Sequence, residues 1–262
     1  MRAFGFALAS SLLLAQPVEA APRRAVSLNL CTDELLLLLA DPRQIASVTH
    51  LSQRPEETPL WQEARRYRRN DGTLMSVAGL KPDLVLTMGG GARDRLRIAE
   101  RLGMKTLDLP FPQRLSDIKA ALIQVGDALG RGAAGRRLAA AIGTLEVAAP
   151  KRQTDTIWLG GGGRTVASNG LAADWMKLAG LRQRTVAGDR VSLEQLLTDP
   201  PHLLLRSDYR SGQYSSGQKW LSHPLAARVR GSRQLATDGR RWTCMGPLMI
   251  SEIRRLRRQG AP

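Results

Sequence analysis

Short apolar runs of the kind found in buried strands alternate with helical patterns along most of the chain, and this alternation constrains the fold most strongly. Residues 45–48, 84–87 and 105–109 are such runs. Between the last two, residues 93–102 have a helical pattern that ends at Gly103, which suits a left-handed helix cap. Strand, helix and strand at this spacing predict parallel βαβ units, and therefore an α/β fold.

A long helical stretch interrupts this alternation near the middle of the chain. Apolar residues recur there at helical spacing: Ile118, Leu122, Val125, Leu129, Leu138, Ile142 and Leu145. Pro150 then ends the pattern. We therefore predict one long, rigid linking helix over residues 113–149. It joins an N-terminal α/β lobe (21–112) to a C-terminal α/β lobe (150–262), each with a mainly parallel sheet flanked by helices.

The two predicted lobes share a local pattern. Residues 76–86 combine a short helix, a turn marked by proline and a buried strand, and residues 192–205 repeat that order. Two similar lobes joined by a helix imply a cleft between them, which is the default ligand site.

The first twenty residues are typical of a secretory signal peptide. Arg2 precedes an apolar run over residues 4–15, and Val18 and Ala20 are small residues at the −3 and −1 positions of a cleavage site. We expect cleavage near Ala20 and a periplasmic mature protein, without a lipid anchor at that position.

The chain carries 39 Lys and Arg against 23 Asp and Glu, a formal net charge of +16. Such an excess fits nucleic acid, an anionic membrane surface or acidic small ligands. Export argues against nucleic acid, so we expect no nucleic-acid partner. The many scattered Arg-Arg pairs also fit a solvated surface.

Candidate ligand-binding residues follow from the predicted strand ends, because ligands of open parallel sheets bind beyond the carboxyl ends of the strands. Aromatic and guanidinium groups in these loops suit a flat or anionic ligand, and Arg210 and Tyr214 lie in the same region. The predicted ligand-binding residues are Asn29, Cys31, Thr32, His50, Arg54, Met88, Arg164, Asn169, Arg206, Tyr209 and Trp242.

Catalytic readings of the same residues are weaker. The glycine runs at 89–91 and 160–163 match neither a P-loop nor a dinucleotide fingerprint, and no G-x-S-x-G elbow occurs. Cys31, His50 and an Asp could form a hydrolytic triad, and His50 could instead bind iron or haem. In an oxidising compartment Cys31 and Cys244 could form a disulfide or stay as free thiols. We predict no catalytic residue, no cofactor and no metal site.

An ordered series of motifs resembles the periplasmic substrate-binding proteins of ABC transporters for iron complexes and cobalamin. These motifs are residues 24–36, the Leu-Lys-Pro-Asp-Leu-Val stretch within 79–86, the long helix, 167–170, 178–181, His223-Pro224 and 241–247. The resemblance implies the class III binding-protein fold, two lobes joined by a rigid helix, and no catalysis. It implies capture of a metal chelate, a ferric siderophore first and cobalamin or haem as alternatives. It also implies delivery by a monomer to an ABC permease and its ATPase.

Two departures from the family's pattern concern docking and ligand. The acidic residue that relatives use to dock the permease is Met75 here, so Glu194, Glu34 or Asp71 would have to replace it. Met88 stands where some relatives have an aromatic residue, which weakens the case for cobalamin. Two other classes of function stay open: an exported cysteine-dependent α/β hydrolase that uses Cys31, and an interaction module that has lost its ligand.

Overall fold

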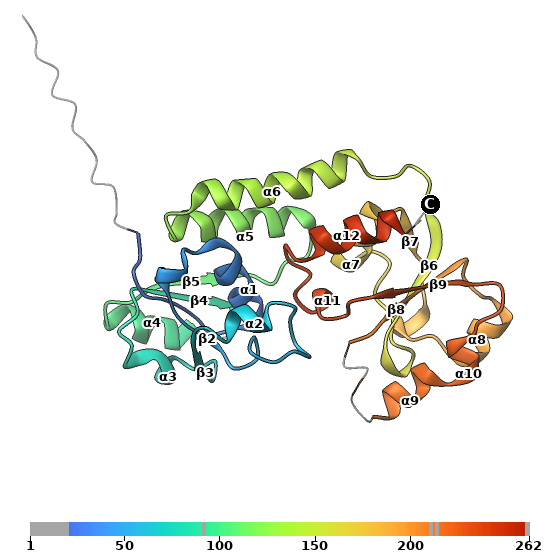
Figure 1. The fold of residues 1–262 in the computed structure, drawn as a ribbon, viewed down its shortest axis with the longest axis horizontal. Coiled ribbons are helices and arrows are strands. Elements are labelled where there is room, and N and C mark those ends of the chain that lie inside the picture. The colour runs from blue at the N-terminus through green and yellow to red at the C-terminus, as the bar shows by residue number, and fades with distance from the viewer. Residues whose placement is uncertain (1–20, 91–92, 210–211, 213–214, 260–262) are drawn as a thin grey trace, which may run out of the picture.

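Figure 1 shows the computed structural model, in which two α/β lobes lie side by side beneath a pair of long helices. The structure describes residues 21–90, 93–209, 212 and 215–259. The predicted signal peptide lies outside the described residues, as do Arg210 and Tyr214 of the predicted ligand loops.

The first lobe is built on a five-stranded sheet in the order β3-β2-β1-β4-β5, and every neighbouring pair of strands is parallel. Its strands are β1 (Ala25–Ser27), β2 (Ile45–Thr49), β3 (Arg68–Asn70), β4 (Leu84–Met88) and β5 (Lys105–Leu109). Its helices are α1 (Leu30–Leu39), α2 (Trp61–Ala64), α3 (Leu74–Ala78) and α4 (Arg93–Arg101), with a short 3₁₀ turn, η1, at Pro42–Gln44.

The second lobe has a four-stranded sheet in the order β7-β6-β8-β9, which is also parallel throughout. Its strands are β6 (Thr154–Leu159), β7 (Leu181–Gln183), β8 (Leu203–Ser207) and β9 (Arg233–Thr237). Its helices are α7 (Leu171–Leu178), α8 (Leu193–Thr198), α9 (Ser216–Ser222), α10 (Pro224–Ala227), α11 (Arg241–Cys244) and α12 (Met249–Arg258), with 3₁₀ turns η2 (Gly161–Gly163) and η3 (Ala187–Asp189). The predicted α/β class, with a parallel sheet in each lobe, is confirmed.

The repeated sequence pattern occupies equivalent places in the two lobes. In the first lobe α3 leads into β4, which pairs with β1; in the second, α8 leads into β8, which pairs with β6. In each case the buried strand of the motif lies beside the first strand of its own sheet.

The linking element differs from the prediction, because the expected single helix is two. Helices α5 (Leu115–Ala128) and α6 (Gly132–Val147) pack side by side, joined by a short turn in which Gly130 has a φ of +67° (Figure 1). Both helices keep an apolar face, so the helical spacing of apolar residues continues across the turn. Gly130 is the residue in the sequence that could have indicated this turn. The chain reverses there, and α6 alone leads into the second sheet.

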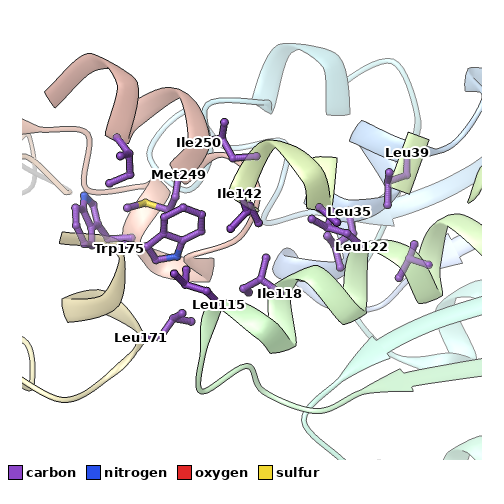
Figure 2. Packing of buried hydrophobic residues seen from close by; sticks show 14 of the residues in the cluster. Leu35, Leu39, Leu115, Ile118, Leu122, Ile142, Leu171, Trp175, Met249 and Ile250 are labelled. Carbon is purple, nitrogen blue, oxygen red and sulfur yellow. The ribbon is translucent and has the colours of Figure 1, made fainter. Parts of the chain in front are cut away.

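One apolar core runs through both lobes. Figure 2 shows its centre, where apolar side chains run from Leu35 of α1 and Leu122 of α5, through Ile142 of α6, to Met249 of α12 and Trp175 of α7. All five side chains are buried. The lobes therefore share a packed junction instead of meeting only through a flexible linker.

An arginine from the last helix reinforces this junction. Arg257 Nε donates to the Leu178 carbonyl at 2.6 Å, and Nη2 donates to the Leu145 carbonyl at 2.9 Å. These carbonyls lie in the last turns of α7 and α6, where backbone acceptors lack helical partners. Arg257 thus ties three helices together at the end of the linking pair.

We predict opposite effects for two alanine substitutions in α6. A Cβ at Gly135 would lie 2.3 Å from the Leu122 carbonyl oxygen of α5, whereas one at Gly143 meets nothing within 4 Å. Gly135→Ala should lower the free energy of unfolding by about 1–3 kcal/mol because the helices must separate. Gly143→Ala should raise it by up to about 1 kcal/mol through helix propensity. Urea unfolding of both variants tests this; an equal effect would contradict the close α5–α6 contact.

Candidate functional site

The carboxyl ends of the two sheets meet at the lobe junction. Loops that follow β1 and β2 in the first lobe touch loops that follow β8 and β9 in the second, and the contacts among the described residues include a disulfide and the hydrogen bonds made by Tyr209 and Arg240. The strands of each sheet are parallel, so all strand-end loops of a lobe lie on this side. The edge of the sheets where ligands of such folds bind is therefore the edge that faces the other lobe.

A disulfide joins Cys31, in the first turn of α1, to Cys244, the last residue of α11. The two Cα atoms lie 5.2 Å apart across a sequence separation of 213 residues. Both cysteines lie at the junction, so the bond fixes the base of the site covalently. The Cys31 sulfur is bonded and in this form supplies no thiolate nucleophile.

Two hydrogen bonds close the outer part of the same junction. The Tyr209 hydroxyl donates to Glu57 Oε2 at 2.9 Å, and Arg240 Nη1 donates to the Pro55 carbonyl at 2.8 Å. Arg240 is held in place by Asp238, whose carboxylate accepts from its Nε and Nη2 at 2.8 and 2.9 Å. Tyr209 is thus a predicted ligand-binding residue that lies where both lobes meet.

Two predicted ligand contacts, Asn29 and Thr32, have roles in the fold. The Asn29 side chain caps α1 by accepting from the Cys31 N–H at 2.8 Å. Thr32 is fully buried, and its hydroxyl pairs with Ser27 Oγ at 2.7 Å and donates to the Asn29 carbonyl at 3.0 Å. The prediction for Thr32 is wrong, because the first turn of α1 folds back over the end of β1.

Trp242 was also expected to offer a flat surface to the ligand, and it is buried instead. Its indole nitrogen donates to Thr237 Oγ1 at 2.7 Å, and its ring centroid lies 6.0 Å from that of Trp158. The side chain belongs to the shared core. The loop in which it was placed is the short helix α11, whose inner face turns toward that core.

The remaining predicted residues spread over the strand ends. His50 follows β2 and is half-buried, with Nδ1 3.3 Å from the Asn70 carbonyl oxygen, and Met88 ends β4. Arg54, Arg164 and Asn169 are exposed. Arg206 points away from the junction, into a pocket between β8, β9 and α9.

The sequence analysis did not predict the burial of two carboxyl groups at the start of α1. Asp33 accepts from the Thr49 N–H at 3.0 Å, and Glu34 accepts from the Thr58 hydroxyl at 2.8 Å. Burial raises the pKa of Asp33 from 3.8 to about 6 and that of Glu34 from 4.5 to about 8, and hydrogen bonds from these threonines oppose the rise. Only their place in an apolar helix, next to Leu35 and Leu36, signals their burial.

Glu34 lies directly beneath the junction. It lines a small cavity of about 20 Å³ together with the disulfide and Met88. That volume is about the size of one water molecule. A carboxyl group that is mostly protonated at neutral pH therefore sits at the base of the site.

The acidic residues proposed to dock the permease in place of Met75 differ in their exposure to solvent. Met75 is 83% exposed on α3, and Glu34 is buried, so Glu34 cannot take a docking role. Glu194 and Asp71 are exposed. In the described part of the chain, no helix is long and apolar enough to cross a membrane.

The sequence of this two-lobed chain matches a family model over residues 26–233, and that model describes periplasmic binding proteins. The chain belongs to the periplasmic binding protein family. None of the curated proteins compared with this binding protein matches it.

Solved structures share the fold at low sequence identity. Vitamin B12 binding protein BtuF of Vibrio cholerae has a TM-score of 0.64 and 16% identity over 91% of this chain and 96% of its own. A periplasmic heme binding protein from Pseudomonas aeruginosa has a TM-score of 0.62 and 20% identity over 91% of this chain and 92% of its own. Siderophore binding protein BauB, bound to acinetobactin and ferric iron, has a TM-score of 0.67 and 12% identity over 91% of this chain and 94% of its own. This binding protein therefore has the class III fold, two parallel sheets flanked by helices.

The disulfide should contribute measurably to stability, because it restricts the unfolded chain. We expect the double variant Cys31→Ser, Cys244→Ser to lose about 2–4 kcal/mol of unfolding free energy. Adding reductant should lower the urea midpoint of the natural protein and leave that of the double variant unchanged. A natural protein insensitive to reductant, with two reactive thiols when unfolded, would contradict the bond.

The raised pKa values give stability a defined pH dependence. Between about pH 5 and pH 8 folded Glu34 keeps a proton that the unfolded chain has lost, so unfolding free energy should fall as pH rises. The stability that comes from this retained proton is fully present below the pKa of Glu34 in the unfolded chain, 4.5, and it is lost above about pH 8. Glu34→Gln should flatten this decline in urea unfolding. Glu194→Gln, at an exposed position, should keep it; equal slopes in both variants would contradict the burial of a protonated Glu34.

Proposed function

We propose that the chain is an exported solute-binding protein that captures a metal chelate between its lobes in the periplasm and delivers it to an ABC permease and its ATPase. The supporting observation is the meeting of strand-end loops from both sheets at one junction, with Glu57 and Tyr209 in contact across it. A ligand held there contacts both lobes at once. Membership of the periplasmic binding protein family supports the same role.

The chelate class follows from charge and from the proteins with the same fold. The net charge of +16 favours an anionic ligand, and Arg54 is an exposed cation in the loop that follows β2. The solved structures that share the fold include siderophore, heme and vitamin B12 binding proteins. We place a ferric siderophore first, with haem and cobalamin as alternatives. The residues that remain predicted contacts are Asn29, Cys31, His50, Arg54, Met88, Arg164, Asn169 and Tyr209.

A cysteine-dependent hydrolase is the weaker alternative. Its nucleophile would be Cys31, and that sulfur is bonded to Cys244.

Permease docking would rest on exposed Glu194 and Asp71, one in each lobe, because Glu34 is buried.

Thermal unfolding of the ligand-stripped mature protein tests the proposal. The panel contains ferric hydroxamates, ferric catecholates, ferric citrate, haem and cobalamin, with each metal-free siderophore as its control. A ligand that binds only the folded state stabilises it by about 2.7 kcal/mol at a hundredfold excess over its dissociation constant. We expect one class to give a saturable shift. The absence of a shift with every member would contradict chelate capture.

A matched pair of arginines then tests where the ligand binds. Arg54 follows the carboxyl end of β2, and Arg43 precedes its amino end; both are exposed. Arg54→Gln should weaken binding about tenfold by removing a charged hydrogen bond. Arg43→Gln should leave the affinity unchanged, and equal effects of the two substitutions would move the ligand away from the strand ends.

A further inference from the structure

A pocket of about 710 Å³ lies within the second lobe, between α9 and the strands β8 and β9. Its volume falls in the range of small-molecule sites, roughly 300–1,000 Å³. The described residues that line it all come from this lobe. Among them the cations Arg206 and Lys219 outnumber the one carboxylate, Asp208.

In the part of the chain that the structure describes, Arg206 is anchored in this pocket by neutral groups only. Its Nη2 donates to the Leu221 carbonyl at 2.8 Å, and its Nη1 donates to the Ala226 carbonyl at 3.3 Å and to Gln234 Oε1 at 3.2 Å. A guanidinium group has five N–H donors. Within the described chain, the Nε–H and one Nη2–H of Arg206 therefore have no acceptor, and no carboxylate pairs with it.

This arrangement leaves a positive charge partly removed from water without an opposite charge. The Arg206 side chain is half-buried, and that burial lowers the pKa of its guanidinium group. The carbonyl groups hold the side chain in one orientation but do not neutralise it. A bound anion would provide the missing charge, and the fixed orientation reduces the entropy that its binding would cost.

The hydroxyl groups of Ser207 and Ser215 also line this pocket. Ser207 Oγ accepts from the Tyr209 N–H at 3.3 Å, and Ser215 Oγ accepts from the Gln218 N–H at 3.2 Å. Among the described residues neither hydroxyl has an acceptor, so each serine keeps its own O–H for a ligand. Together with Arg206 they present hydrogen-bond donors to the same pocket.

We propose that this pocket is a second ligand site, which binds a small organic acid through a carboxylate group on Arg206. A planar guanidinium group with neighbouring free N–H donors matches the two oxygens of a carboxylate. The volume leaves room for an acid with several carboxylates. The site adjoins the loop that carries Tyr209 to the junction, but its described lining residues all belong to the second lobe, and it does not depend on the proposed chelate capture.

Isothermal titration of the ligand-stripped mature protein with metal-free citrate tests this site. We expect saturable binding that Arg206→Gln weakens at least about tenfold, the effect of losing one charged hydrogen bond. Arg230→Gln removes an exposed arginine of the same lobe that does not line the pocket, and it should leave the affinity unchanged. Inorganic phosphate is the second probe: weaker binding than citrate supports an organic acid, and tighter binding overturns that choice.

A second variant is needed because Arg206 also has a structural role: it donates to the carbonyl groups of Leu221 and Ala226. Lys219→Gln changes an exposed cation of α9 and spares those bonds, so it should weaken citrate binding several-fold while circular dichroism shows a folded protein. No saturable binding of citrate would overturn the proposal, and so would unchanged affinity in Lys219→Gln or in folded Arg206→Gln. Because this citrate carries no metal, failure here leaves the chelate panel unaffected.

Discussion

The shared apolar core at the lobe junction is the constraint on which the rest of the structure depends. Helices α5 and α6 pack against α1 on one side and against α7 and α12 on the other (Figure 2). Burial of large side chains such as Trp175 and Leu122 would be lost if the lobes parted there. The disulfide between Cys31 and Cys244 adds a covalent link at the same junction. The strand-end loops are therefore brought together by the fold itself, before any ligand binds.

The positive charge of the chain is divided between structural and exposed arginines. Arg257 and Arg206 donate to carbonyl groups of helices, and Arg184 pairs with Asp155 beside the second sheet. Such side chains have structural partners within the fold and also add to the net charge. Arg54 and Arg164 are exposed at the strand ends and remain available to an anionic ligand. The net charge of +16 is therefore an upper bound on the positive charge that can contact a ligand at the strand ends.

The sequence was sufficient for the fold class and for the buried strands, because runs such as those in β4 and β8 are continuously apolar. It missed β3, β7 and β9, which are edge strands that contain arginine or glutamine. It also missed the turn between α5 and α6, where the apolar period continues through Gly130. Edge strands and turns depend on tertiary contacts, which local patterns do not record.

The candidate site was harder to predict than the fold. Strand-end reasoning indicated loops that meet at the junction, including the loop of Tyr209, but it could not tell which side chains turn inward. Thr32 and Trp242 bond within their own lobes, and Glu34 is buried by helices distant in sequence. Native mass spectrometry of the protein purified without denaturation from its natural host tests solute capture most directly. The account predicts a mass above that of the mature chain by one metal chelate, which denaturation releases; the mass of the mature chain alone, from iron-limited and iron-replete cells alike, would contradict it.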